Sequence, residues 1–298
     1  MVMPCGMNRA QEYRAGPRDT SFLSILDGGF GLQYSTLLEY REGTGMVLFC
    51  QTDVTARSEG DPAPDTLTRN ILEYVANWKP VPRRSAVYAG EPAGKNYLEA
   101  AGLPVKDYAG GKLSPDEVLV VGHGGRASNI AEYLKAGGHL LAVGLDQADA
   151  DALLPFKVGL KRAEHIAATF TSPGPDSLLA GIGPAEVHNR DPRELPLIAS
   201  GAQSLGNGIL AQAEKANVVF CQLAPWQFDG SSSNLRRTRR HTARLLSRLL
   251  ANMGVAAATP LLERFHHPVA AKPEPRWLTG FYQDQPEEWD DPYRFFRW

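Results

Sequence analysis

The sequence predicts an α/β protein built on a mostly parallel sheet that helices cover on both faces. Short apolar segments alternate with helical patterns between residues 85 and 154, and this alternation is typical of parallel sheets. A second observation is an internal repeat. Met46-Val-Leu-Phe-Cys-Gln51 and the helical pattern over 69–78 recur as Asn217-Val-Val-Phe-Cys-Gln222 and a helical segment that ends at Gly254. Two copies are too few for a solenoid, so the repeat indicates two related α/β units, the first of them incomplete.

Length and charge exclude several classes of protein. The 298 residues suit one large domain or two ordinary ones. A net charge of −2 gives no overall field that favours nucleic acid or an anionic membrane, so neither is expected as a partner. No apolar run reaches the roughly 20 residues of a membrane span, and residues 1–9 lack the apolar core of a secretory signal. The compartment therefore stays unknown, with the cytoplasm as the default expectation.

The incomplete unit is predicted over residues 21–80, after an irregular polar lead-in over 1–20. Its strands are expected over 22–26, 36–40 and 46–50. The last two flank a Glu-Gly-Thr-Gly turn and are predicted to form a β-hairpin.

A helix is expected to follow Asp61-Pro62, because Asp is a favoured N-cap and Pro suits the first helical turn. Apolar residues at helical spacing form one face of this helix: Leu67, Ile71, Tyr74, Val75 and Trp78. This face is predicted to pack on a sheet. Residues 81–84, which follow, are interpreted as a Pro-containing linker.

The second unit, residues 85–254, is predicted to contain the complete sheet. Its strand patterns cover residues 85–89, 104–108, 117–121 and 139–143, and the helices between and after them are expected to end near 101, 136 and 154. Asp146 is expected to be the N-cap of the last of these helices. Residues 155–195 are rich in Pro and Gly and are predicted to be an irregular insertion. Strands over 195–198, 208–212 and 217–222 then precede the final helix, and residues 255–298 form an aromatic, acidic tail.

Three features of the second unit resemble the class I glutamine amidotransferase-like superfamily. They are the strand 117–121 with Gly122-His-Gly-Gly125, the segment Lys135-Ala-Gly-Gly-His-Leu-Leu-Ala-Val-Gly144, and the strand-to-loop step over 218–226. The resemblance implies a flavodoxin-like, doubly wound fold over 85–254, while 21–80 resembles the second half of the same domain. With the ending Trp289-Asp-Asp-Pro-Tyr-Arg-Phe-Phe-Arg-Trp298, the paired units look like the C-terminal region of large bacterial glycoside-hydrolase-like proteins. A related non-catalytic domain serves in β-galactosidase trimerisation.

The chain lacks the residues that catalyse the reaction in active members of this family. Those members place a nucleophilic Cys at the turn after the strand that corresponds to 140–143, where this chain has Gly144-Leu-Asp146. Their general base is a His just after the strand that corresponds to 218–220, with a Glu two residues on. Here that stretch is Cys221-Gln-Leu-Ala-Pro-Trp226. Because nucleophile, base and carboxylate act as a unit, glutaminase activity is not expected and no catalytic residue is assigned.

Ligand-binding candidates lie on loops after the predicted parallel strands, where doubly wound folds bind ligands. They are His123, Gly124, Gly125, Asp146, Gln222 and Trp226. Backbone N–H groups of Gly122–Gly125 would hold a phosphate or a sugar hydroxyl near a helix N-terminus. The same residues also suit a tight turn with a solvent-facing His, and the frequency of Gly-rich turns in this fold favours the turn.

No metal and no other cofactor is expected. The histidines are scattered and lack the His-x-x-x-His spacing of a zinc site on a helix. Cys50 and Cys221 lie within predicted strands, where a free Cys is usually a small buried hydrophobe. The arginines over 236–248 are interpreted as a solvated helix face, since the whole chain is not basic. The aromatic and acidic tail over 277–298 suits a sugar platform or, preferably, a strap that docks on the α/β body.

Three functional hypotheses follow. The first is a non-catalytic accessory or assembly region of a carbohydrate-active protein, with other modules or further copies of the chain as partners. The second is a glycan-active hydrolase whose catalytic residues lie on upstream modules or, less favoured, around His123, Asp146 and the tail carboxylates. The third is a module that binds a small molecule, a sugar or a phosphate, at the carboxyl ends of the strands.

Overall fold

The computed structural model describes most of the chain between residues 22 and 255. The described residues are 22–28, 34–42, 45–52, 54, 59–79, 83–100, 103–174, 177–189, 192–228, 242 and 245–255. The chain divides into two compact units, one with residues 1–81 and 259–298 and the other with residues 82–258. The predicted lead-in, most of the Arg-rich segment and the aromatic tail lie outside the described residues. Among the helices of the described part, none has the length and apolar character to span a membrane.

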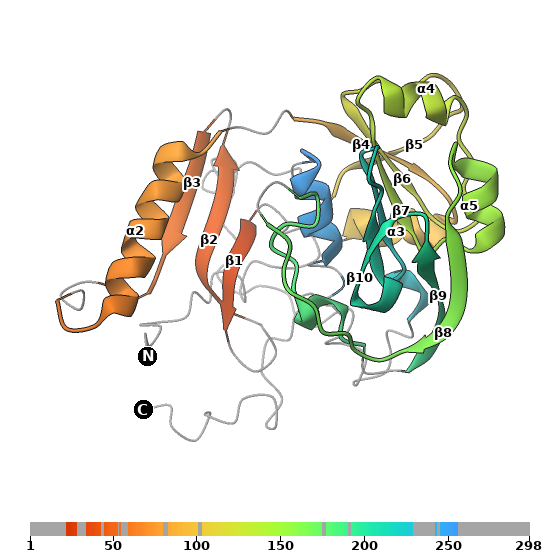
Figure 1. Ribbon diagram of the computed structural model, residues 1–298. Helices are drawn as coiled ribbons and strands as arrows, with labels where there is room; N and C mark the ends of the chain where they lie inside the picture. Colours follow the sequence, from red (N-terminus) through yellow and green to blue (C-terminus); the bar gives the residue numbers. More distant parts are fainter. Residues whose placement is uncertain are drawn as a thin grey trace, which may run out of the picture. The chain divides into compact units, whose positions relative to one another are not determined.

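The first unit is a three-stranded antiparallel sheet with one long helix. Strands β1 (Phe22–Gly28), β2 (Tyr34–Glu42) and β3 (Gly45–Cys50) pair in chain order (Figure 1). The predicted hairpin is confirmed, because β2 and β3 pair antiparallel with Glu42 opposite Gly45. Helix α2 (Pro62–Asn77) is confirmed as well, and the side chain of Asp61 accepts a hydrogen bond from Ala63 N at 2.9 Å.

The apolar face of α2 is less buried than the sequence predicts. Leu67, Ile71 and Trp78 are half-buried, but Tyr74 and Val75 are 43% and 46% exposed. The Tyr74 hydroxyl donates to the carboxylate of the buried Glu39 on β2. The phenol therefore bridges α2 and the sheet through its polar end, and its ring stays accessible.

The second unit is organised around a seven-stranded, largely parallel sheet. The strands are β4 (Ser85–Ala89), β5 (Val105–Asp107), β6 (Glu117–Val121), β7 (His139–Val143), β10 (Gln203–Leu205), β11 (Leu210–Gln212) and β12 (Val218–Cys221). Their order is β10-β11-β12-β7-β6-β4-β5. Strand β11 runs antiparallel to both of its neighbours, β10 and β12, and the pairs among β12, β7, β6, β4 and β5 are parallel. Numbered along the chain, the five parallel strands run 2-1-3-4-5. The order therefore reverses between β4 and β6.

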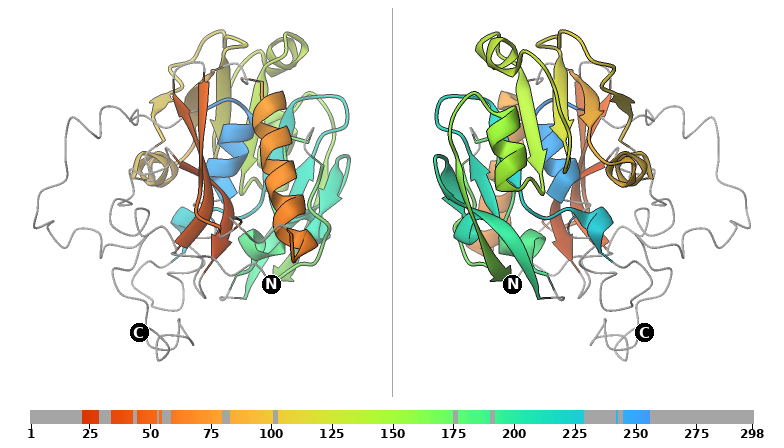
Figure 2. Two further views of the ribbon diagram at one scale, coloured as in Figure 1. Left: turned by 90° about the vertical axis from the view of Figure 1, so that its left-hand side faces the viewer. Right: turned by 90° about the vertical axis from the view of Figure 1, so that its right-hand side faces the viewer.

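Helices cover both faces of this sheet. Because side chains on both faces are then buried, the central parallel strands are apolar along most of their length. Every residue of β7 is buried. Helices α4 (Ile130–Lys135) and α5 (Gln147–Leu153) lie on one face, and the helical residues 245–252 lie on the other (Figures 1 and 2). Helix α3 (Pro92–Ala100) follows β4. The α/β class and the largely parallel sheet predicted from the alternating pattern are thus confirmed.

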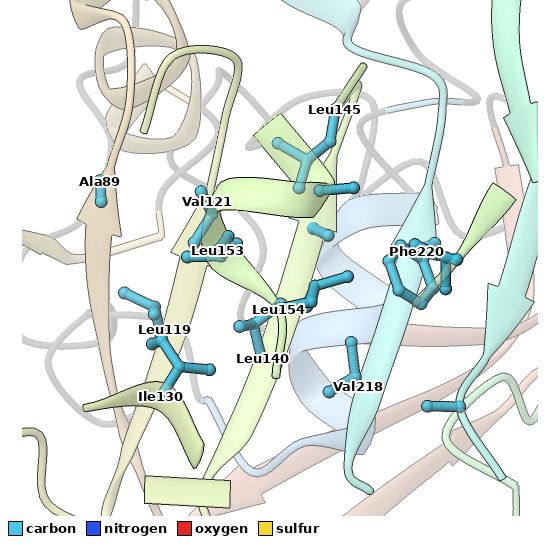
Figure 3. Packing of buried hydrophobic residues seen from close by; sticks show 14 of the residues in the cluster. Ala89, Leu119, Val121, Ile130, Leu140, Leu145, Leu153, Leu154, Val218 and Phe220 are labelled. Atoms are coloured by element: carbon cyan, nitrogen blue, oxygen red, sulfur yellow. The ribbon is translucent and has the colours of Figure 1, made fainter. Parts of the chain in front are cut away.

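The core under α4 and α5 is a layer of branched apolar side chains. Leu119, Leu140 and Phe220 come from three different strands and meet Ile130 of α4 and Leu153 of α5 (Figure 3). All are 5% exposed or less. Full burial of each such side chain contributes about 1.5–3 kcal/mol, so this layer is a substantial source of the stability of the unit.

Two further sequence predictions need correction. Residues 155–195 are not wholly irregular, because β8 (Gly159–His165) pairs antiparallel with β9 (Arg193–Ser200). The residues of β8 are largely polar and partly exposed, so the sequence shows no strand pattern there. The segment forms a strand because it pairs with the more apolar β9. The other correction concerns Cys50, which is exposed at the end of β3, whereas Cys221 is buried as predicted.

Candidate functional site

The loop after β6 is held against β4 by its glycines. Gly122 N donates to Ala89 O at 2.9 Å, and Gly124 has a left-handed φ of 71°. A Cβ atom on Gly125 would lie 2.3 Å from Ala89 O, so only glycine permits this approach. The sequence motif Gly122-His-Gly-Gly125 is therefore a tight turn, and it fixes the position of His123 at the carboxyl edge of the sheet.

The imidazole of His123 contacts a buried carboxylate. His123 Nδ1 lies 2.7 Å from Asp149 Oδ2; the His123 side chain is 54% exposed, whereas that of Asp149 is 4% exposed. Asp149 lies in the first turn of α5, which begins after the neighbouring strand β7. Adjacent parallel strands thus bring the two side chains together from separate loops.

Asp146 is the third member of this cluster. It is the N-cap of α5, as predicted, and its Oδ1 accepts a hydrogen bond from Asp149 N at 2.8 Å. Its other oxygen, Oδ2, lies 4.0 Å from His123 Nδ1. His123, Asp146 and Asp149 each offer one donor atom, and these three atoms lie within 4.8 Å of one another.

Arg126 and a backbone amide complete the surroundings of Asp149. Arg126 Nη1 donates to Asp149 Oδ1 at 2.8 Å, and Gly124 N donates to Oδ2 at 3.2 Å. Burial alone would raise the pKa of Asp149, but the hydrogen bonds from Arg126 and Gly124 and the nearby His123 outweigh it and lower the pKa. The buried carboxylate is therefore charged at neutral pH.

A pocket of about 480 Å³ lies beside this cluster. Its lining residues are Tyr88, Ala89, Gly90, Pro92, Lys95, Asn96, Asp107, Tyr108, Gly124, Gly125 and Arg126. They lie at or just after the carboxyl ends of β4, β5 and β6, or belong to the first half of α3. The pocket thus lies where the strand order reverses, which is the usual place for a ligand in an open α/β sheet.

Several polar side chains that line the pocket are fixed by hydrogen bonds or ion pairs within the protein. Lys95 Nζ lies 2.5 Å from Asp107 Oδ2, and this hydrogen bond raises the pKa of Lys95. The Tyr108 hydroxyl donates to Gly111 O at 2.8 Å and accepts from Ser128 N at 3.1 Å. Tyr108 therefore ties the loop after β5 to the loop after β6 and fixes the shape of the pocket.

The two remaining candidates are Gln222 and Trp226. Their side chains form hydrogen bonds with residues other than His123, Asp146 and Asp149. Gln222 is buried, and its Nε2 donates to Leu145 O at 3.0 Å and to Pro196 O. Trp226 Nε1 donates to Glu91 Oε1 at 2.5 Å, and its ring centroid is 5.9 Å from that of Tyr97. Gln222 thus holds loops together in the interior, and Trp226 packs on α3.

The turn after β7 has a left-handed residue at its start. Gly144 has φ 63°, and its N–H donates to Cys221 O at 2.9 Å. A Cβ atom there would lie 3.1 Å from the Ala224 Cβ. The backbone of this turn is therefore sharply bent and is occupied by a residue without a side chain.

Sequence reasoning missed Asp149 and most of the pocket. The available signal for Asp149 was its place three residues after the predicted N-cap Asp146, which puts it at the helix start beside the next loop. Lys95, Asn96 and Asp107 gave no signal, because their proximity depends on the β4–β5 pairing. No protein-family model matches the chain, and no curated protein matches it by sequence.

Proposed function

We propose that residues 85–254 form a non-catalytic, amidotransferase-like accessory domain of a carbohydrate-active protein. The parallel strand order 2-1-3-4-5 supports the flavodoxin-like part of this proposal, because it is the order of that doubly wound topology. The observation that carries the proposal is the turn at Gly144, which has a left-handed φ of 63° and no side chain. Active members of the resembling family have their nucleophilic Cys at this turn.

The position of the family's general base also supports a non-catalytic domain. Gln222 and Leu223, which follow β12, are both buried, and the amide of Gln222 bonds to backbone carbonyl groups. Cys221 is buried too, and burial raises the pKa of its thiol to about 12. A protonated, inaccessible thiol is not a nucleophile.

The direct test is a hydrolase screen of the full chain with glutamine, aryl esters and aryl glycosides. We expect no turnover of any of them above that of a heat-denatured sample. Glutamine or ester turnover that disappears in a Cys50→Ala/Cys221→Ala double variant would overturn the proposal. Turnover of an aryl glycoside that disappears in His123→Ala would instead support the hydrolase hypothesis.

The repeat supports a second copy of part of this domain. Strands β1-β2-β3 and β10-β11-β12 are both antiparallel three-stranded sets. A helix follows each set, α2 in the first unit and residues 245–252 in the second. We interpret the first unit as an incomplete amidotransferase-like unit, with further modules or further copies of the chain as its partners.

Binding of a small molecule is a second candidate function, and the 480 Å³ pocket favours it. The pocket pairs a tyrosine ring, Tyr108, with the polar side chains of Lys95, Asn96 and Asp107. Rings with neighbouring hydrogen-bonding groups suit a monosaccharide, and the cations Lys95 and Arg126 suit a phosphate.

Titration of the isotopically labelled chain with monosaccharides and with inorganic phosphate, followed by NMR, tests this candidate. Shifts should concentrate on Gly90, Asn96 and Gly124, and Asn96→Ala should weaken them. The matched control Asp116→Ala changes an exposed residue outside the pocket lining and should have no effect. Unchanged spectra with every probe would remove the candidate and leave the accessory role untouched.

A further inference from the structure

We propose that His123, Asp146 and Asp149 bind a divalent transition-metal ion, with zinc as the expected occupant. The three side chains follow two adjacent parallel strands, β6 and β7. This inference is independent of the accessory role proposed above, because it depends only on the donor atoms and their supports.

The donor atoms are close to the spacing that a zinc ion imposes. His123 Nδ1 is 2.7 Å from Asp149 Oδ2 and 4.0 Å from Asp146 Oδ2. Ligand atoms around a tetrahedral zinc ion with bonds of about 2.0–2.2 Å lie about 3.3 Å apart. One observed distance lies below that value and the other above it. A metal ion would replace the proton that joins His123 Nδ1 to Asp149 Oδ2, and side-chain rotations would then complete the three bonds.

The second oxygen of each carboxylate is already fixed by the protein. Asp146 Oδ1 accepts from Asp149 N at 2.8 Å, and Asp149 Oδ1 accepts from Arg126 Nη1 at 2.8 Å. The two Oδ2 atoms are the ones nearest the imidazole, and Asp149 Oδ2 also accepts a hydrogen bond from Gly124 N at 3.2 Å. Outer hydrogen bonds of this kind orient ligating side chains in metal sites. The protein therefore already holds both carboxylates beside the imidazole.

Burial explains why a cation would be favoured here. The carboxylate of Asp149 is 4% exposed, while His123 and Asp146 remain accessible from solvent. A buried carboxylate is stabilised by positive charge. Arg126 supplies one such charge on Oδ1, and an ion on the solvent side would supply a second next to Oδ2.

The donor set selects the class of ion. One imidazole nitrogen and two carboxylate oxygens suit zinc and its neighbours, whereas calcium takes six to eight oxygen ligands. Three protein ligands also leave a zinc position for water or substrate. The histidine spacing of the sequence did not indicate this site, because only one ligand is a histidine and the others come from the next strand's loop.

Isothermal titration of the full chain with zinc chloride tests the proposal, with the cobalt(II) absorption spectrum as a second readout. The variants are His123→Ala, at an exposed side chain, and Asp146→Asn, which keeps an N-capping oxygen. His188→Ala and Asp151→Asn are the matched controls, since both residues are exposed and lie outside the cluster. Circular dichroism verifies that each variant is folded.

We expect one zinc ion to bind the parent with an affinity that falls about tenfold or more in each cluster variant. The controls should bind like the parent, and the cobalt band should disappear in His123→Ala. Absence of zinc binding by the parent at millimolar zinc would overturn the proposal. Equal binding by parent and cluster variants would overturn it too, because zinc would then be held elsewhere on the chain.

Discussion

The hydroxyl of Tyr133 donates to the backbone carbonyl of His139 at 2.7 Å and accepts a hydrogen bond from His139 N at 3.0 Å. It also lies 2.6 Å from Glu117 O and 3.3 Å from Leu119 N. One phenol on α4 thus contacts backbone groups at the start of both β6 and β7. Burial raises the pKa of Tyr133, so the group stays protonated as these bonds require.

Tyr133→Phe is expected to destabilise the second unit. Buried backbone groups of β6 and β7 would lose their partner, and each unsatisfied group costs about 1–3 kcal/mol. Urea unfolding followed by circular dichroism measures the change. Lys135→Gln, an exposed substitution on the same helix, is the control and should leave the midpoint unchanged. A Phe variant as stable as the parent would show that water replaces the hydroxyl.

Gly122→Ala is expected to destabilise the loop of the candidate site, because the added Cβ would clash with one atom of Tyr88. A Cβ there would lie 2.4 Å from the Tyr88 hydroxyl oxygen, although 3.3 Å from the nearest ring carbon. Overpacking of this kind costs about 1–3 kcal/mol. In a Tyr88→Phe background the cost should fall by more than half, and a double-mutant cycle measures this coupling. Equal costs in both backgrounds would place the strain in the backbone instead.

Acid is expected to weaken the second unit through two buried histidines. The pKa values of His139 and His165 lie below the ordinary 6.5, chiefly because burial disfavours the charged ring. Between the lowered and the ordinary pKa the unfolded chain binds more protons than the folded chain. The free energy of unfolding should therefore fall as pH drops below about 6.5, by up to about 1.4 kcal/mol per pH unit for each histidine.

Denaturation midpoints measured from about pH 7 to about pH 5 test this prediction. A His165→Gln variant should have a flatter profile, because the amide can bond to Val187 O as the ring does at 2.7 Å but takes up no proton. A parent profile that is flat over this range would contradict the assigned direction of both pKa values.

The two described cysteines are expected to differ in reactivity toward thiol reagents. Cys50 is exposed, and its Sγ lies 2.9 Å from the hydroxyl of Thr52. Cys221 is fully buried, and burial raises its pKa to about 12. A maleimide reagent should label Cys50 within minutes and Cys221 only after unfolding, as peptide mapping by mass spectrometry would show. Fast labelling of Cys221 in the native protein would mean that β12 opens.

The sequence predicts the sheet better than the site because apolar periodicity reports burial. Strand β7 and the N-cap Asp146 were predicted correctly, since each depends on residues adjacent in the chain. Strand β8 was missed, because its polar residues depend on pairing with β9. Asp149 was missed for a similar reason. Its partners His123 and Arg126 belong to the preceding strand's loop, and only the β6–β7 pairing brings them within reach.

The seven-stranded sheet ends in β5 on one side and β10 on the other, and each of these strands has only three residues. A strand of that length presents few backbone N–H and C=O groups to a passing chain, so it is a poor template for β-augmentation. The partners proposed above, further copies or other modules, are therefore expected to dock on the second unit through side-chain surfaces and loops. Contacts of this kind would leave the hydrogen bonds between the strands unchanged. The short edge strands would also disfavour edge-to-edge aggregation of the sheet.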